Sequence, residues 1–222
     1  CVDKKGDNNK LSDVNKVEVL EYLQDKKVLS IQPEIVDAKY INIVLDILFK
    51  YNPNITSLVT NEMQAKVQTE VLKPYNLNIL NQFDTIFRHS QFTNLVDSSS
   101  RAILNSHVRV FVSQEITIPA NASVSNFILE FGVELDVDDE RSIISVVSDV
   151  KWCENGRKLF LADEKSSTNT LERNLYLYNY INSKIIRVRD VGSLNLKTGV
   201  MQLNSIFADN EVKLKIIVKP KN

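Results

Sequence analysis

The sequence of 222 residues predicts an α+β protein with two domains. Residues 28–119 are expected to form a two-layer α/β sandwich in the order ββααβ, and residues 120–222 an antiparallel all-β domain that resembles a β-sandwich. Residues 1–27 are expected to hold a flexible start and a short helix. Three observations support this prediction: a long period-two alternation at residues 40–51, two helical patterns between strand-like segments, and the loss of helical periodicity after the first domain.

The start of the chain carries the signals of a flexible segment, a helix and a strand. Residues 1–12 are polar and rich in Gly, Asn and Lys, a composition typical of flexible segments. A short helix is expected over residues 14–25, and a first strand over residues 28–36. Pro33 places that strand at a sheet edge or a bulge, and residues 37–39 are expected to turn it back as a hairpin. Because the chain begins with a cysteine in place of a methionine, we expect it to be part of a longer polypeptide.

The second strand is the strongest local signal in the sequence. Every odd position from Ile41 to Tyr51 is apolar, whereas Asn42, Asp46 and Lys50 occupy even positions. A period of two is typical of a strand that buries one face. We therefore expect the odd-numbered face to be core and the Asn-Pro pair that follows to end the strand.

Two helices and a further strand complete the first predicted domain. Met63, Val67 and Val71 recur every fourth residue and predict a helix that ends before Pro74. Residues 75–83 are ambiguous between helix and loop.

Ser90 is expected to cap the second helix, which passes through Val96 and ends at the serine run of residues 98–100. Residues 107–118 alternate as the last strand of this domain.

Short strands separated by turn residues predict the second domain. Residues 119–123 have the composition of a linker, and residues 127–135 then alternate as a strand. Turns are expected at Asn155-Gly156, at Asn182-Ser183 and at Lys197-Thr198-Gly199, because these residues tolerate positive φ. Several short strands at this spacing indicate an antiparallel sandwich or an open barrel.

Composition excludes several classes of function. The net charge of −1, from 27 basic and 28 acidic residues, gives no general attraction to nucleic acid or to an anionic membrane. No apolar run approaches the ~20 residues of a membrane span, and the polar start is unlike a signal peptide. Cys1 and Cys153 are too few for a disulfide framework, so we expect a reducing compartment.

The residues that carry chemistry are scattered. His89 and His107 are the two histidines, and neither has a carboxylate at metal-ligand spacing. The acidic run at residues 136–140 lacks the glycine of a calcium loop, and the five glycines never cluster as a phosphate-binding loop requires. We therefore expect no catalytic residue, no bound metal or cofactor, and no small-molecule substrate; the protein is predicted not to be an enzyme.

Aromatic residues beside basic ones provide the candidate interface. Phe87 and Arg88 form one such group, and Tyr176 and Tyr178 belong to another. Aromatic and arginine side chains are the usual anchors of protein interfaces, although the same residues can be core or can stack on sugars. One candidate function is therefore a surface adhesin or carbohydrate-binding module that uses these aromatic residues; a hydrolase is a more distant candidate.

Several segments of the chain form a recognisable series: Ile35 to Tyr40, Tyr51-Asn52-Pro53, the helix from Asn61 to Lys73 with Tyr75-Asn76, Phe87-Arg88-His89-Ser90, Val96-Asp97, Ile103 to Ser106, and the hairpin from Val191 to Leu203. Together these segments resemble the baseplate J-like family of contractile phage tails, and within it the C-terminal part of the wedge subunits of T-even-type phages. In that hairpin Leu196 replaces the tyrosine usual in the family, and Val96 replaces an isoleucine.

The resemblance implies a structural role with no enzymatic activity. Wedge subunits join one another into a ring around the tail tube, hold neighbouring wedge proteins, and transmit the baseplate change that starts sheath contraction. It also implies that the partners are other baseplate wedge proteins and copies of this chain. The expected location is the virion tail baseplate, with assembly in the host cytoplasm.

Overall fold

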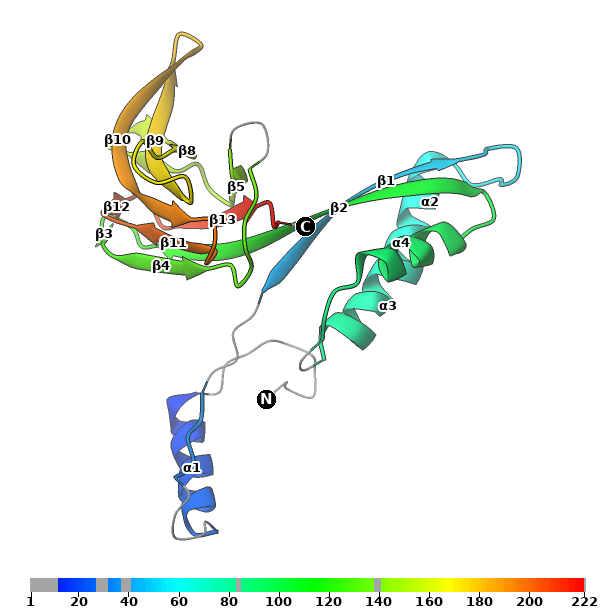
Figure 1. Ribbon diagram of the computed structural model, residues 1–222, viewed down its shortest axis with the longest axis horizontal. Helices are drawn as coiled ribbons and strands as arrows, with labels where there is room; N and C mark the ends of the chain where they lie inside the picture. Colours follow the sequence, from blue (N-terminus) through cyan, green and yellow to red (C-terminus); the bar gives the residue numbers. More distant parts are fainter. Residues whose placement is uncertain (1–11, 27–31, 37–40, 83–84, 138–140, 222) are drawn as a thin grey trace. The chain divides into compact units, whose positions relative to one another are not determined.

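The computed structural model describes residues 12–26, 32–36, 41–82, 85–137 and 141–221 (Figure 1). The chain divides into two compact units: Cys1–Tyr40 with Phe49–Ser106, and Ile41–Leu48 with His107–Asn222. Strands β1 (Asn42–Tyr51) and β2 (Ile103–Ile118) have residues in both units. The helices precede a β-rich part with antiparallel pairing, which confirms the predicted α+β class with a C-terminal all-β region. The predicted division of the chain at residue 119 stays a prediction.

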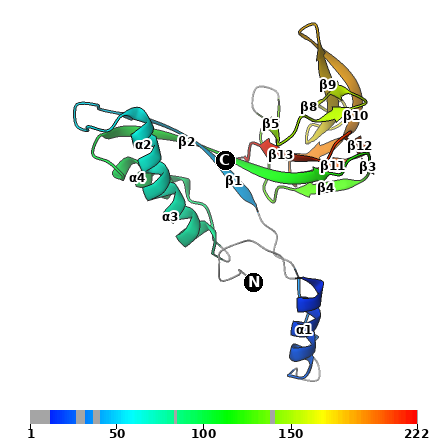
Figure 2. The same cartoon turned by 180° about the vertical axis from the view of Figure 1, so that it is seen from behind.

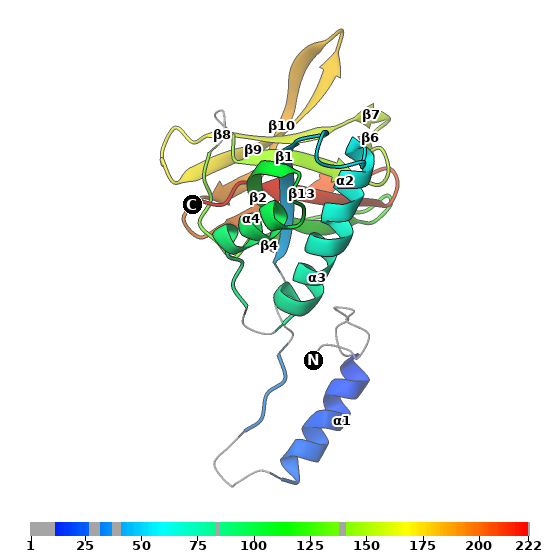
Figure 3. The same ribbon diagram turned by 90° about the vertical axis from the view of Figure 1, so that its right-hand side faces the viewer.

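The first unit contains a long helical run and one further helix. Four contiguous segments make the run, and Figure 3 shows them as one column: α2 (Thr60–Val67), the π-helical turn η1 (Gln68–Leu72), α3 (Lys73–Tyr75) and the π-helical turn η2 (Asn76–Leu80). The other helices are α1 (Asp13–Gln24) and α4 (His89–Ser98). No residue of α1 is buried, and Val14 and Tyr22 are among its exposed apolar side chains.

The helical run passes through Pro74, so the predicted end before this proline was wrong. Proline lacks an N–H, and in an α-helix its ring collides with the carbonyl four residues earlier. Here the N–H of Lys73 donates to the carbonyl of Gln68, five residues earlier, as in a π-turn. The wider π-turn changes the local spacing of carbonyls, which gives the proline a place inside the run. The ambiguous residues 75–83 are accordingly helical as far as Leu80.

The apolar spacing of these helices is confirmed by burial. Met63, Val67 and Val71 are buried, and Tyr75 continues the same spacing on the same side. From α4, Phe92 and Val96 are fully buried. The helix begins at His89, one residue before the predicted cap Ser90, because the N–H of Phe92 already donates to the carbonyl of Arg88 at 3.0 Å.

Strand β1 confirms the long predicted strand, but its odd face is only half-buried. Ile43 and Ile47 are both partly exposed, so the prediction of a core face was too strong. The physical reason is position: in the sheet order β1-β2-β13-β5, strand β1 is an edge strand with one strand beside it. Residues 32–36 form no strand, contrary to prediction, whereas residues 28–31 and the predicted turn at 37–39 lie outside the described residues.

Two antiparallel sheets form the second unit. The first has the order β1-β2-β13-β5 and the second the order β4-β11-β10-β9-β8. Their remaining strands are β4 (Phe127–Glu130), β5 (Ile143–Ser148), β8 (Phe160–Lys165), β9 (Glu172–Ile181), β10 (Lys184–Asn195), β11 (Val200–Leu203) and β13 (Val212–Val218). Two small ribbons pair β3 (Ser123–Val124) with β12 (Ile206–Phe207), side by side in Figure 2, and β6 (Cys153–Glu154) with β7 (Arg157–Lys158).

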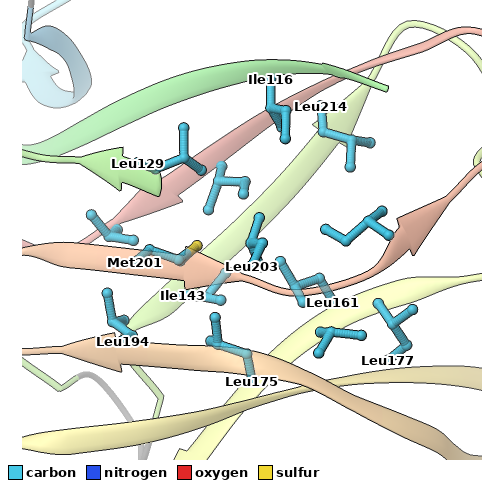
Figure 4. Packing of buried hydrophobic residues seen from close by; sticks show 14 of the residues in the cluster. Ile116, Leu129, Ile143, Leu161, Leu175, Leu177, Leu194, Met201, Leu203 and Leu214 are labelled. Atoms are coloured by element: carbon cyan, nitrogen blue, oxygen red, sulfur yellow. The ribbon is translucent and has the colours of Figure 1, made fainter. Parts of the chain in front are cut away.

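The core of this unit contains inward-facing residues of both sheets. Figure 4 shows Ile116 and Leu214 of the first sheet packed in one cluster with Leu129, Met201 and Leu203 of the second. Apolar residues at alternate positions of two facing sheets are typical of a β-sandwich. The sequence left an antiparallel sandwich and an open barrel as alternatives, and the structure has the sandwich.

The predicted turns form where residues tolerate positive φ. Asn182 and Ser183 (φ 49° and 64°) join β9 to β10, as predicted. Asn155-Gly156 also turns, but it joins the short strands β6 and β7, which the sequence did not predict. At the third turn the Oδ1 of Asn195 accepts hydrogen bonds from the backbone N–H groups of Lys197 and Thr198, each at 3.0 Å.

The strand predicted over residues 127–135 ends at Glu130, because Gly132 follows with a φ of +72°.

Candidate interaction surface

The four predicted interface residues are divided between the two units. Phe87 and Arg88 precede α4 in the first unit, whereas Tyr176 and Tyr178 lie on β9 in the second. Each pair is therefore a separate candidate, and both remain predictions as binding residues.

Phe87 is held within an aromatic cluster of the first unit. Its ring centre lies 6.0 Å from that of Tyr75 in an edge-to-face arrangement and 5.8 Å from that of Phe92. Because Tyr75 and Phe92 are buried, Phe87 closes this cluster and is itself only partly exposed. Arg88 is exposed and has no ion pair among the described residues, so it is the better anchor of the two.

Tyr176 and Tyr178 belong to an aromatic row on the outer side of the second sheet. Tyr178 stacks on Phe160 with ring centres 5.3 Å apart, and Tyr180 packs edge-to-face on both of these rings. The guanidinium of Arg187 lies 4.5 Å from the ring centre of Tyr176 and covers it. These rings mainly contact one another, so their flat faces are less available to a sugar than isolated exposed rings would be.

Burial and hydrogen bonds shift the pKa values of two side chains on this face, Tyr178 and Arg187. Burial, and next the hydrogen bond with Tyr180, raise the pKa of the Tyr178 phenol above its ordinary value, although Arg141 acts in the opposite direction. Hydrogen bonds first to Asp190 and then to Glu164 raise the pKa of Arg187. Arg187 donates to Glu164 at 2.6 Å and to Asp190 at 2.9 Å, so this part of the face is held by an exposed ion-pair network.

The far half of the β9–β10 hairpin exposes apolar side chains on both of its faces, and we name it the β9–β10 arm (residues 178–188). Figure 1 shows the hairpin, in yellow to orange, extending beyond the other strands of its sheet. Its large apolar side chains are between 38% and 54% exposed: Tyr180, Ile181, Ile185, Ile186 and Val188. Contiguous exposed apolar surface is typical of an interaction site. The sequence offered one signal for it, the adjacent Ile185 and Ile186, which a strand with one wet face would not have.

A hollow of about 1050 Å³, lined by both charged and apolar residues, opens on the second unit beside β8 and β9. Its lining includes Asp163 and Arg173, whose side chains are 0% and 5% exposed and lie 2.9 Å apart. The carboxylate of Asp163 also accepts the backbone N–H groups of Ser142 and Ile143, at 2.8 and 3.0 Å. Because this carboxylate is already bound to three donors, the arrangement suits a structural role better than acid–base chemistry.

The described residues provide no group of His, Cys, Asp or Glu that could hold a metal ion. His89 and His107 are exposed and lie in different units. Of the predicted acidic run, residues 138–140 lie outside the described residues. Among the described helices, none is long and apolar enough to cross a membrane.

One comparison with known families gives a match. Residues 39–115 match the family model described as "Baseplate structural protein gp6, C-terminal domain III". No curated protein shows significant similarity to the chain. The match supports a structural role in a phage baseplate wedge. It does not extend to the baseplate J-like family that the sequence segments resemble.

Proposed function

We propose that this chain is a structural subunit of the baseplate wedge of a contractile phage tail, that it joins neighbouring wedges into a ring around the tail tube, and that it helps to trigger sheath contraction. One observation carries the proposal, the match of residues 39–115 to a baseplate structural protein model. The partners are other wedge proteins and copies of the chain itself, and not nucleic acid, a membrane or a small-molecule substrate. It acts without enzymatic activity in the virion baseplate, after assembly in the host cytoplasm.

Two structural features support a subunit that binds neighbours and passes on a displacement. The β9–β10 arm carries apolar side chains that another protein can cover. Strands β1 and β2 each contribute residues to both units, so two stretches of hydrogen-bonded backbone connect the units. A subunit that relays a conformational change needs such a connection between its parts.

Incorporation into the particle tests the proposal. The affinity-tagged chain is expressed during infection by its phage, and purified particles are examined by immunogold electron microscopy against the tag. Gold is expected at the baseplate, whereas gold on tail fibres or on the cell surface would contradict the proposal.

The arm supplies a sharper variant for the same experiment. Ile185→Asp combined with Ile186→Asp is expected to abolish incorporation, because a charge would have to be buried at the contact. Leu171→Asp, at an exposed apolar residue elsewhere in the same unit, is the control and is expected to incorporate normally. Since all three side chains are exposed, melting temperatures should stay close to that of the unmodified chain.

The alternative function is an adhesin or carbohydrate-binding module, and the aromatic row on β9 is the observation that favours it. Tyr176, Tyr178 and Tyr180 share one face of the sheet with Phe160. A glycan array distinguishes the two functions: specific glycan binding that is lost in Tyr180→Ala, without incorporation into particles, would establish the adhesin in place of the wedge subunit.

A further inference from the structure

The β10 strand of the β9–β10 arm has an outer edge, on the side away from β9, that no described strand pairs with. Strand β10 begins at Lys184, but β11 pairs with it only from Gly192 to Asn195. We name this side of residues 184–188 the β10 edge. We propose that the β10 edge binds an extended acidic segment of another protein, which adds to the sheet as a further strand. The inference deepens the proposed function and rests on it only in taking the occupant from another protein.

The exposure of β10 changes along the strand. Residues 184–188 are all exposed, whereas Val191 is buried. The N–H of Asn204 donates to the carbonyl of Val191 at 2.6 Å, and Nη1 of Arg189 donates to the carbonyl of Ser205, also at 2.6 Å. The chain that follows β11 therefore lies beside β10 at these residues, and the β10 edge begins beyond them.

The turn of the hairpin determines which backbone groups face the β10 edge. Both loop residues, 182–183, have positive φ (49° and 64°), and Ile181 lies opposite Lys184 at the base of the loop. A two-residue loop of this kind closes on a hydrogen-bonded pair, and such pairs alternate along an antiparallel ladder with pairs whose backbone groups point outward. The N–H and C=O groups of Ile185 and Arg187 therefore point away from β9, where they have no hydrogen-bond partner among the described residues.

The β10 edge is regular enough to accept a strand. Its register with β9 is uninterrupted from Lys184 to Arg187, and the first bulge follows at Val188. Unpaired backbone groups at a sheet edge are a template for an extended segment of another chain. The side chains of Ile185 and Ile186 point to opposite faces and are 54% and 42% exposed, so an added strand can cover apolar surface on both faces.

The charge of the β10 edge favours an acidic segment of a different protein. Lys184 is exposed and forms no ion pair with any of the described residues, whereas Arg187 is already paired with Glu164 and Asp190. Two copies of β10 paired edge to edge would bring Lys184 and Arg187 of both chains into one short ladder, where like charges are destabilising. A segment with a carboxylate beside Lys184 forms a favourable pair instead.

A peptide with blocked backbone positions tests strand addition. The 222-residue chain is titrated with a fluorescein-labelled peptide in which valine alternates with threonine and glutamate stands at both ends, and binding is followed by fluorescence anisotropy. Two further peptides carry N-methyl groups, one on its valines and the other on its threonines. Since alternate N–H groups of an added strand face the sheet, one N-methylated peptide should lose affinity by about tenfold or more, and the other should bind like the parent.

Ile185→Pro removes a donor of the β10 edge and leaves the ladder with β9 intact. Proline is tolerated in an edge strand where the N–H faces solvent, so the melting temperature, followed by the emission of the buried Trp152, should change little. Peptide affinity should fall by about tenfold or more. Ile185→Thr is the matched control: it keeps the N–H at the same position and should retain most of the binding. Ile186→Pro removes an N–H that faces β9 and should lower the melting temperature.

A charge exchange tests the acidic character of the occupant. The parent peptide should bind better than the same peptide with lysine at both ends, by about twofold to fivefold, because the pair with Lys184 is exposed to solvent. Lys184→Glu is expected to reverse this preference. An unchanged preference would contradict the assignment of an acidic segment.

Three further results would overturn the inference: no binding of the parent peptide at millimolar concentration, equal binding of the two N-methylated peptides, or unchanged binding by Ile185→Pro. A dimer of the free chain in light scattering that Ile185→Pro dissociates would also overturn it, because the occupant would then be a second copy. Peptide binding by a chain that never enters baseplates would establish the β10 edge and refute the proposed function. A chain that enters baseplates but binds no peptide would refute this inference alone.

Discussion

Replacement of Arg173 by methionine is expected to destabilise the second unit strongly, because it leaves a buried carboxylate without its counter-charge. The side chains of Asp163 and Arg173 are 0% and 5% exposed, and the Nε–Oδ2 distance is 2.9 Å. Removing one partner of a buried ion pair costs about 3–5 kcal/mol, a large part of the 5–15 kcal/mol that stabilise a typical domain. The backbone N–H groups of Ser142 and Ile143 still bind the carboxylate, so we expect the lower half of that range.

Urea denaturation followed by tryptophan fluorescence measures this effect. The single tryptophan, Trp152, is 3% exposed and belongs to the core of the second unit, so its emission reports the unfolding of that unit. Arg187→Met is the matched control: it removes an arginine from the same sheet, but that side chain is 41% exposed in its ion pairs, and exposed pairs contribute about 0–1 kcal/mol. If the two variants lose stability equally, the buried pair has no special role and the reasoning fails.

Three further changes test other parts of the molecule. Ile47→Asp should cost about 1–3 kcal/mol in urea denaturation because Ile47 is half-buried, whereas Asn42→Asp should stay within about 0.5 kcal/mol; equal costs would mean that the faces of β1 are exchanged. Gly199→Ala should lower the calorimetric melting temperature markedly, because Gly199 has a φ of +64° and an added Cβ would lie 2.2 Å from the carbonyl oxygen of Val133; an unchanged melting temperature would refute this. The raised pKa of Tyr178 implies stability that is fully present below its ordinary pKa of 10.0 and is lost as the pH rises through the higher folded pKa, so Tyr178→Phe should lessen the alkaline loss of stability in pH titrations of unfolding.

Local chemistry made the turns and the long strand predictable. Asn182-Ser183 and Gly199 adopt the positive φ values that their residue types tolerate. This tolerance depends on the residue type alone, so the sequence is enough to predict such a turn. The helical run through Pro74 was missed because a proline is normally read as a helix end. The spacing that continues from Val71 to the buried Tyr75 was the available sign that the helix does not stop there.

Strand register could not be predicted, and the buried ion pair and the candidate surfaces depend on it. Asp163 is two residues from the buried Leu161, and Arg173 two residues from the buried Leu175, so alternation alone places both charges on the inner face. Their contact follows only from the β8–β9 register, in which Lys165 lies opposite Arg173 and Asp163 lies opposite Leu175. In this register Asp163 and Arg173 are diagonal neighbours on the same face of the sheet. Alternation within one strand carries no information about its partner, because pairing is set by contacts distant in sequence.

The β9–β10 arm is the place where alternation itself fails, and the failure has a physical interpretation. A strand with one wet face should not carry apolar side chains at two successive positions, yet Ile185 and Ile186 point to opposite faces and both are more than 40% exposed. Strands with two apolar faces are typically covered on both sides. The arm has the side chains of a covered strand and the exposure of an uncovered one, and a partner that covers it reconciles the two.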